Sequence, residues 1–319
     1  MPSKQAHHLV DDIPFLGLAI ALGSGLYLSD WFHFFHPYTG LLLQLVFFAS
    51  GLKLDLKVML TELRDTKLVV MVVLLRLVVF PLFVFLIASQ FFPAWTVPFV
   101  LIAAMPAGMT SPLFVDMVRG NVPLSLLLTL ATSIFSVGTL PFVLDFLGGD
   151  VLLYDPLIMF RTLFVVMLVP IVLAQIVRMS SFGQFLIGRS HHVVRISSIF
   201  MLWLLIATIT SKHSTALLEG FHRGDIAPIF LALTVSFVVF HIFSYVICFW
   251  RSQRDRLTVT LSLSYMNFTL AIFLAETLFR DPPMILIVIL SMLPWNFGLI
   301  VFQWLIRSRG WMLPKTSNY

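Results

Sequence analysis

The sequence predicts an all-α polytopic membrane protein with ten transmembrane helices. Hydrophobic residues make up 59% of the 319 residues, charged residues make up 11%, and long apolar runs recur between short polar segments. A soluble domain carries about 25% charged and about 45–50% apolar residues, so this chain has too few polar groups to cover a globular surface. The composition therefore excludes a soluble enzyme, a nucleic-acid-binding protein and a disordered protein, and it makes the lipid bilayer the expected surrounding.

Ten apolar runs account for the predicted helices. A helix needs about 20 mainly apolar residues to cross a hydrocarbon core of about 30 Å. The second run is short, but its flanks and the turn at Pro37 and Gly40 favour a separate helix over a loop. The expected spans are residues 13–29, 38–52, 67–92, 96–118, 123–147, 156–178, 194–211, 226–250, 256–279 and 282–306.

The positive charges predict the orientation of these spans. With ten spans, both termini and the loops after spans 2, 4, 6 and 8 lie on one side of the membrane. That side carries fifteen of the twenty Lys and Arg residues, the other side carries four, and Arg76 lies inside a span. Because positive charge collects on the cytoplasmic side, we expect both termini in the cytoplasm, with the protein in a plasma or inner membrane.

Two of the spans contain residues that interrupt a helix. Span 4 includes Pro106, Gly108 and Pro112, which remove backbone donors and favour unwinding. Span 9 includes a polar cluster over residues 262–269, with Asn267 near its middle. Non-helical backbone persists at membrane depth only where it is buried in protein or lines a cavity, so both interruptions are candidate parts of a binding site.

The two interruptions lie about half the chain apart, a spacing typical of transporters with inverted repeats. We therefore expect one transmembrane domain, residues 1–319, built from five-helix repeats over about 13–147 and about 156–306. Spans 4 and 9 would be broken and would cross. The alternative is that the prolines only kink span 4 and that the polar groups of span 9 hydrogen-bond between helices.

Three stretches of the chain resemble the bile acid:sodium symporter family: residues 47–55, 106–133 and 267–271. The second is the most specific, because it combines a broken helix, an Arg-Gly-Asn turn at 119–121 and spaced hydroxyls. The resemblance covers nearly the whole length. It implies a core of spans 3–5 and 8–10, a panel of spans 1, 2, 6 and 7, and organic-anion uptake coupled to two sodium ions behind the crossing.

The same resemblance marks the positions of the expected sodium ligands and shows where this chain departs from them. Ser262 stands where the family has an acidic residue, Arg76 and Met266 where it has glutamines, and Pro112 where it has Asn. At 4 Å and an effective dielectric of about 20, two unit charges interact by about 4 kcal/mol. We therefore expect the second sodium site to be absent and the first to be weakened. The expected ion-site positions are Ser111, Ser125, Thr129, Ser262 and Met266.

Arg76 is the only basic residue well inside a span, and such residues usually face a cavity or a partner. One hypothesis is that its guanidinium occupies the former cation site and holds unwound carbonyls, which gives sodium-independent transport. A second is that it meets a carboxylate or sulfate of the substrate. A third is a structural ion pair with Asp116 or Glu276, or extension toward the membrane interface. Either acid is also a candidate carrier of a coupling proton.

These observations favour a secondary active or facilitative transporter that moves a small or amphipathic organic anion by alternating access. The chain lacks the common metalloprotease, phosphate-loop and nucleophile-elbow motifs, and its single cysteine, Cys248, excludes a multi-cysteine metal site. Neither catalytic residues nor a cofactor other than sodium is expected.

Alternatives are a carrier of auxin-like acids or metalloid oxyanions, a non-transporting sensor or scaffold, and a membrane enzyme. The expected substrate-binding residues are Pro106, Gly108, Thr110, Ser111, Asn267 and Arg76, and Ser111, Thr129, Ser262 and Asn267 are expected to line the cavity.

Overall fold

The computed structural model describes residues 17–148, 154–223, 226–279 and 282–309. Within these residues every regular element is a helix, and the only strand-like pairing is a single bridge. The contacts divide the chain into two compact units. The first unit is formed by the described residues within 1–54, 161–226 and 272–286, and the second by those within 55–160, 227–271 and 287–319.

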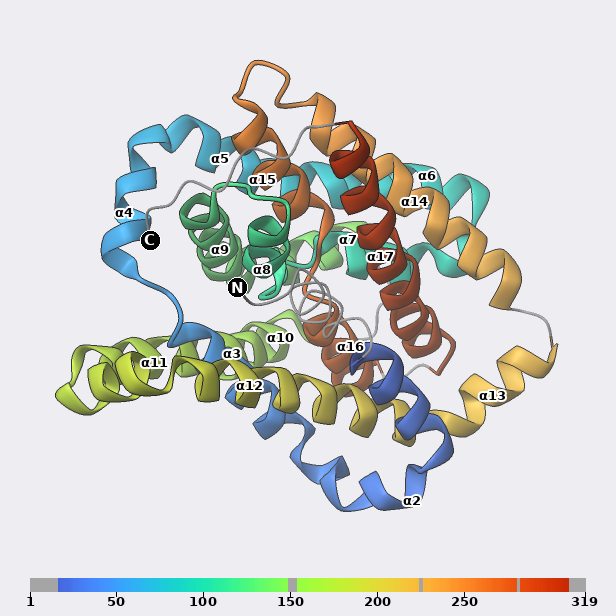
Figure 1. Ribbon diagram of the computed structural model, residues 1–319. Coiled ribbons are helices and arrows are strands. Elements are labelled where there is room, and N and C mark those ends of the chain that lie inside the picture. The colour runs from blue at the N-terminus through green and yellow to red at the C-terminus, as the bar shows by residue number, and fades with distance from the viewer. Residues whose placement is uncertain (1–16, 149–153, 224–225, 280–281, 310–319) are drawn as a thin grey trace. The chain divides into compact units, whose positions relative to one another are not determined.

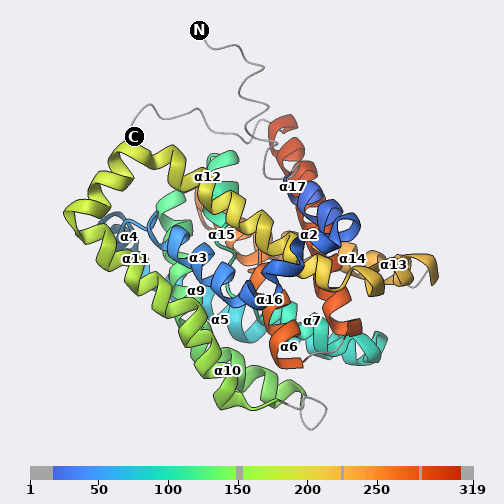
Figure 2. The ribbon, with the colours of Figure 1, turned by 90° about the horizontal axis from the view of Figure 1, so that it is seen from below.

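The first unit is centred on α3, which packs against α11 and α12 (Figure 2). Gly51 permits a close approach at the end of α3, because a Cβ at this residue would lie 2.8 Å from the Cβ of Ala174. The carbonyls left open at this helix end accept hydrogen bonds from Gln175 and Arg178, at 2.6 Å to Gly51 and 2.7 Å to Leu52. Its elements are the helix Gly17–Tyr27, α2 (Ser29–Phe32), η1 (His33–Tyr38), α3 (Thr39–Gly51), η6 (Phe164–Leu168), α11 (Val169–Met179), α12 (Ser181–Lys212), α13 (Ser214–Arg223) and η7 (Ala275–Phe279).

The second unit is built around α9, against which α4, α5, α7, α8 and α15 pack. Buried hydroxyls line α9, so its inner face is polar although its sequence is mainly apolar. The elements of this unit are α4 (Leu56–Glu62), η2 (Leu63–Asp65), α5 (Thr66–Leu74), η3 (Leu75–Val79), α6 (Phe80–Phe91), η4 (Pro93–Trp95), α7 (Thr96–Ala104), α8 (Ser111–Met117), α9 (Val122–Gly148), α14 (Ile226–Val246), α15 (Gln253–Ser264) and α17 (Pro282–Ser308). The helices α10 (Pro156–Leu163) and α16 (Phe268–Leu274) each contribute to both units, and the first residues of α17, up to Leu286, belong to the first unit.

Prolines produce two π-helical turns within helices that are otherwise α-helical. The segment η3 ends just before Pro81, and η6 ends just before Pro170. A proline has no N–H to donate to the preceding turn, and its ring crowds that turn, so the helix widens there. In η3 this widening places Arg76 on a buried face of the second unit.

Five described helices are long and apolar enough to cross a membrane, and four further apolar helices are shorter. The five are Thr66–Phe91, Val122–Gly148, Pro156–Met179, Ile226–Val246 and Pro283–Ser308. One expected boundary was wrong: α12 begins at Ser181, so residues 181–193, which we assigned to a connection, are helical. The hydroxyl of Ser180 accepts from the N–H of Gly183 and caps this start.

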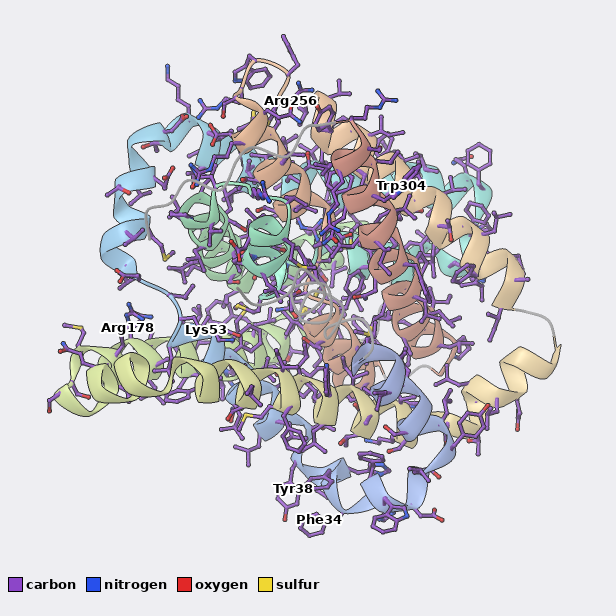
Figure 3. All side chains as sticks on the ribbon, viewed as in Figure 1. Phe34, Tyr38, Lys53, Arg178, Arg256 and Trp304 are labelled. Carbon is purple, nitrogen blue, oxygen red and sulfur yellow. The ribbon has the colours of Figure 1, made fainter. Side chains whose placement is uncertain are left out.

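Large apolar side chains cover the outer faces of many helices. Trp304 on α17 is 65% exposed. Phe34 in η1 is 70% exposed, and it projects outward together with Tyr38 (Figure 3). In a water-soluble protein such faces would have to be covered, whereas in a bilayer they contact lipid, with aromatic rings favoured near the headgroups.

A cluster of titratable groups lies in the first unit where η1, η7 and the end of α12 meet. Lys212 donates to the carboxylate of Glu276, and this acid is only 8% exposed. His36 bonds to the hydroxyl of Ser211 at 2.8 Å. His36 lies in the short helix η1, and His213 lies between α12 and α13. Burial lowers the pKa of both imidazoles below 6.5, and Lys212 lowers both pKa values further.

These lowered pKa values predict that acid destabilises the fold. The unfolded chain takes up protons on His36 and His213 near pH 6.5, whereas the folded chain takes them up only at lower pH. Stability that is present above pH 6.5 is therefore lost as the pH falls toward the lowered pKa values. Thermal unfolding in detergent between pH 7.5 and 5.5 should show a shallower pH slope in a His36→Asn, His213→Asn double variant. His33→Asn removes only the contribution of His33 to the lowered pKa of His36, so it should reduce the slope less than the double variant does. An unchanged slope in the double variant contradicts the prediction.

Candidate functional site

The first interruption separates α7 from α8. The helix α7 ends at Ala104, Met105 adopts an extended conformation, and α8 begins at Ser111. Between them Pro106, Ala107 and Gly108 are all buried. The break therefore falls at the Pro-Gly segment that predicted it.

The second interruption separates α15 from α16. The helix α15 ends at Ser264, Tyr265 is extended, and α16 begins at Phe268. Tyr265, Met266 and Asn267 are 2–4% exposed. This break is narrower than the polar cluster over residues 262–269 that predicted it.

The two interruptions lie side by side and bond to each other through their backbones (Figure 1). Ala107 and Met266 form an antiparallel bridge. On one side of the bridge the N–H of Gly108 donates to the carbonyl of Tyr265 at 2.9 Å, and on the other the N–H of Asn267 donates to the carbonyl of Pro106 at 3.0 Å. The two broken helices thus satisfy part of each other's unpaired backbone groups, as buried backbone requires.

Side chains satisfy the remaining backbone groups of the break in α15. The N–H of Asn267 would normally bond to the carbonyl of Leu263 four residues earlier, but it is committed to Pro106. Nη1 of Arg76 donates to that carbonyl instead, at 3.2 Å. The indole N–H of Trp295 donates to the carbonyl of Ser264 at 2.5 Å.

The break after α7 is anchored in the same way. The hydroxyl of Thr132 on α9 accepts from the N–H of Ala107 at 3.1 Å, and Ser111 donates to the carbonyl of Tyr265 at 3.4 Å. The phenol of Tyr265 donates to the carbonyl of Trp295 at 3.1 Å. Thr132, Tyr265 and Trp295 were not among the expected site residues, because their roles depend on contacts between distant segments.

The expected ion-site positions lie together in the second unit, but without a carboxylate among them. Ser125 on α9 and Ser262 on α15 face each other, with 3.2 Å between their hydroxyl oxygens. Thr129 is 1% exposed, and its hydroxyl has no hydrogen-bond partner among the described residues. Met266 contributes its backbone to the bridge and offers only a thioether. These positions therefore offer hydroxyls and a thioether, while Arg76 donates to a carbonyl of the break.

The expected substrate-binding residues divide into two groups. Pro106, Gly108 and Ser111 are used in holding the crossing together, and Thr110 is partly exposed beside them. Asn267 and Arg76 keep unused donors, although Oδ1 of Asn267 accepts from Thr269 and from the N–H of Leu270. Among the described residues, Nδ2 of Asn267 and Nε and Nη2 of Arg76 are buried without a hydrogen-bond partner.

The structure contradicts an ion pair between Arg76 and either expected acid. Glu276 pairs with Lys212, and Asp116 is exposed on α8. Arg76 does not extend to an interface either, since its exposed fraction is 0%. Of the three interpretations of this residue, those in which it holds the broken backbone or meets an anion agree with its surroundings.

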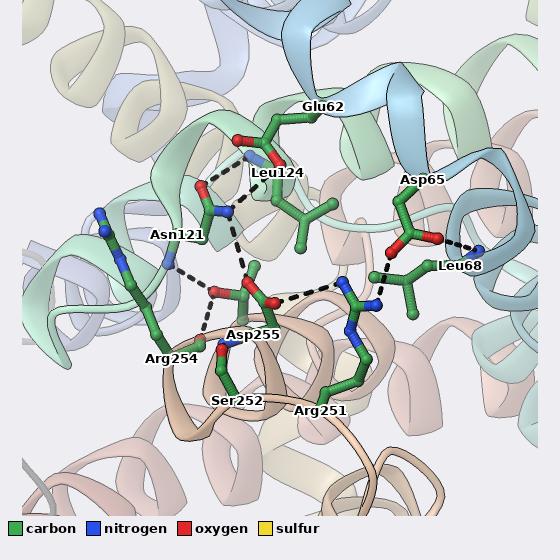
Figure 4. A network of polar contacts seen from close by, with 10 residues as sticks. Glu62, Asp65, Leu68, Asn121, Leu124, Arg251, Ser252, Arg254 and Asp255 are labelled. Carbon is green, nitrogen blue, oxygen red and sulfur yellow. Dashed lines mark hydrogen bonds and ion pairs between the residues drawn. The ribbon is translucent and has the colours of Figure 1, made fainter.

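A polar network fixes the ends of α8 and α15 next to α4 (Figure 4). Arg119 has a φ of 60°, and this turn presents the N–H of Asn121 to the hydroxyl of Thr258 at 2.6 Å. The Asn121 amide donates to Glu62 at 3.3 Å and to Asp255 at 3.4 Å. Arg251 bridges Asp255, at 3.3 Å, and Asp65, at 2.6 Å.

Comparison with protein families identifies the family of this chain. The sodium bile acid symporter family matches residues 40–219, which is more than half of the chain and includes Arg76 and the first interruption. The chain belongs to this family. No curated protein matches the sequence. Membership in a family of sodium and bile acid transporters, together with the apolar helices, makes the protein an integral membrane protein of the transporter class.

The close backbone approach at the crossing predicts that Gly108 tolerates no side chain. A Cβ there would lie 2.8 Å from the carbonyl oxygen of Met266 and 3.2 Å from its carbonyl carbon. We expect Gly108→Ala to destabilise the protein by about 1–3 kcal/mol, because backbone atoms have to move apart. Thermal unfolding in detergent measures this. Gly138→Ala on α9 is the matched control, since its Cβ would meet nothing within 4 Å, and equal melting temperatures of the two variants would refute the close approach.

The network predicts a charge-specific effect at Asn121. Asn121→Asp keeps the side-chain oxygen that accepts from the N–H of Leu124 but places a carboxylate between Glu62 and Asp255. We expect a loss of about 1–3 kcal/mol, because two donors disappear and like charges meet, with partial recovery at high salt. Asn121→Ser removes the amide without adding charge and should show little salt dependence. The prediction fails if both variants respond equally to salt in thermal unfolding.

Proposed function

We propose that the protein transports a small or amphipathic organic anion by alternating access and that it does so without sodium. The observation that carries the proposal is the paired interruption of two helices, with the guanidinium of Arg76 donating to the carbonyl of Leu263 at 3.2 Å. A guanidinium at this carbonyl supplies the positive charge that a bound cation would otherwise supply, and it also donates a hydrogen bond to the carbonyl. The charge is covalently fixed, so it needs no ion from solution.

Electrostatics supports the loss of the second sodium ion. A sodium ion about 4 Å from a guanidinium loses about 4 kcal/mol at an effective dielectric of about 20. That energy corresponds to about a thousandfold in affinity. The expected acid is replaced by Ser262, which bonds to another hydroxyl, so this position holds no carboxylate that would offset the repulsion.

We further propose the ten-span topology with inverted repeats and cytoplasmic termini. Five long apolar helices account for spans 3, 5, 6, 8 and 10. The shorter helices Gly17–Tyr27, Pro93–Ala104, Ile196–Lys212 and Phe268–Phe279, together with α3, account for the others. The contacts support the division into core and panel, because the second unit gathers spans 3–5, 8, most of span 10 and the first part of span 9.

The polar residues proposed to meet the substrate are Asn267 and Arg76, with Thr110 and Ser111 at the same crossing. Donors without a partner outnumber acceptors there, which suits an anionic ligand. A metalloid oxyanion carrier is less well supported, because the single thiol of Cys248 is buried beyond the end of α14, outside the crossing.

Counterflow in proteoliposomes tests the function. Liposomes loaded with cholate should accumulate external radiolabelled cholate at rates that agree within about twofold in sodium chloride and choline chloride. Strict sodium dependence would overturn sodium independence. A sensor would bind cholate without exchange, and an enzyme would alter it chemically, so chromatography of the recovered label separates these alternatives.

The converse experiment restores the expected sodium ligands in one double variant, Arg76→Gln with Ser262→Glu. Sodium should then raise the melting temperature of the double variant above its value in choline, while the parent protein shows no such difference. The single variant Arg76→Gln is the control for removing the cation alone. If sodium fails to stabilise the double variant, our assignment of these positions is wrong.

A further inference from the structure

Only one part of the Arg76 guanidinium is used by the protein. Nη1 donates to the carbonyl of Leu263, whereas Nε and Nη2 are buried and have no hydrogen-bond partner among the described residues. A buried donor without a partner keeps its full cost of desolvation, and that cost is larger when the donor is charged. A protein rarely retains such a group unless it meets a ligand or another polar group.

The positive charge of Arg76 is also unbalanced within the described residues. Glu276 forms an ion pair with Lys212, and Asp116 is exposed. The acids nearest the ends of α8 and α15 belong to the network around Asn121 and Arg251. An isolated buried charge is costly, and a counter-charge from outside the protein relieves that cost.

The geometry of the two unpaired nitrogens, Nε and Nη2, favours one kind of anionic group as their partner. In an arginine side chain, the Nε–H and one Nη2–H are parallel and project along the same edge of the planar group. This edge matches the two oxygens of a carboxylate, which accept two parallel hydrogen bonds. A spherical anion such as chloride gains less from this geometry.

The helix that packs against the turn carrying Arg76 supplies further donors. The π-helical turn η3, which carries Arg76, packs against α9. On α9 the hydroxyls of Thr129 and Ser133 are buried without partners among the described residues. Single π-helical turns occur frequently at functional sites.

We propose that the Nε–Nη2 edge of Arg76 is a binding subsite for a carboxylate group of the transported solute. This inference rests on the proposed transport function and narrows its substrate class from organic anions to carboxylic acids. Arg76 then has two roles, because Nη1 holds the broken helix while the opposite edge binds the solute.

Calorimetric titration of the purified full-length protein in detergent tests the subsite. The probes, added as choline salts where charged, are benzoate, the neutral isostere benzamide, benzenesulfonate and chloride. Benzoate should bind at least tenfold more tightly than benzamide and benzenesulfonate, and chloride should compete weakly. The proposal is overturned by equal binding of benzoate and benzamide, by binding of chloride alone, or by the absence of any benzoate binding.

The variant Arg76→Lys tests the contribution of the two parallel N–H groups. Lysine keeps the positive charge and can still donate hydrogen bonds from one nitrogen, but it has no parallel pair of N–H groups on a planar edge. The variant's affinity for benzoate should fall at least tenfold, whereas the exposed Arg161→Lys should leave affinity unchanged. An unchanged affinity in Arg76→Lys contradicts the subsite. If Arg76→Lys does not fold, infrared difference spectra of the parent protein with ¹³C-carboxyl benzoate decide the question: a shifted antisymmetric carboxylate stretch supports the paired bonds, and a stretch at the solution position refutes them.

The failures of the two proposals are distinguishable. If benzoate binding depends on Arg76 but no carboxylate shows counterflow in proteoliposomes, the subsite is supported and the transport function is refuted. If cholate shows counterflow with the same KM in Arg76→Lys as in the parent protein, the transport function is supported and the subsite is refuted.

Discussion

The structure of the site depends on one constraint, which is that backbone groups released by a broken helix inside a buried region need new partners. Each of the three carbonyls at the end of α15 has one. Leu263 accepts from Arg76, Ser264 from Trp295, and Tyr265 from Gly108 and Ser111. The partners come from η3, from α17 and from the other interruption, so the break exists only because separate parts of the second unit are already in place. This explains why a site assembled at a crossing can be both unwound and well defined.

Arg76 links this backbone constraint to the electrostatics of the site. A neutral side chain could donate to the carbonyl of Leu263, but it would leave the site without the positive charge that the family's sodium ions provide. A fixed guanidinium provides both, at an insertion cost of about 2.5–3.5 kcal/mol near the centre of a membrane. Its hydrogen bond to the carbonyl offsets part of that cost, and under our proposals a bound carboxylate offsets more. Burial of the charge and recognition of an anion are therefore two consequences of the same substitution.

How far the sequence predicts this molecule depends on the range of the interactions involved. The break after α7 was predictable because Pro106, Gly108 and Pro112 act locally on the backbone. The break at Asn267 was visible only as a polar cluster, and its limits were set by contacts with residues about 160 positions earlier. The start of α12 was missed because hydropathy marks the apolar part of a helix, while a polar extension capped by Ser180 leaves no hydropathy signal. The burial of Glu276 and the roles of Thr132 and Trp295 arise from tertiary contacts, which no local pattern reports.

A fixed cation changes what can drive transport. A sodium ion that binds and leaves with the solute adds the free energy of its own gradient to each cycle, whereas a guanidinium remains with the protein in every state. Under the proposed function, net movement of the anion then follows the anion's own electrochemical gradient, or the gradient of a second anion exchanged for it. An empty carrier would have to reorient with the buried charge of Arg76 uncompensated, which is unfavourable in a low-dielectric interior. Reorientation with a carboxylate bound avoids this state, so the electrostatics of Arg76 favour obligatory exchange of one carboxylate for another over net uptake.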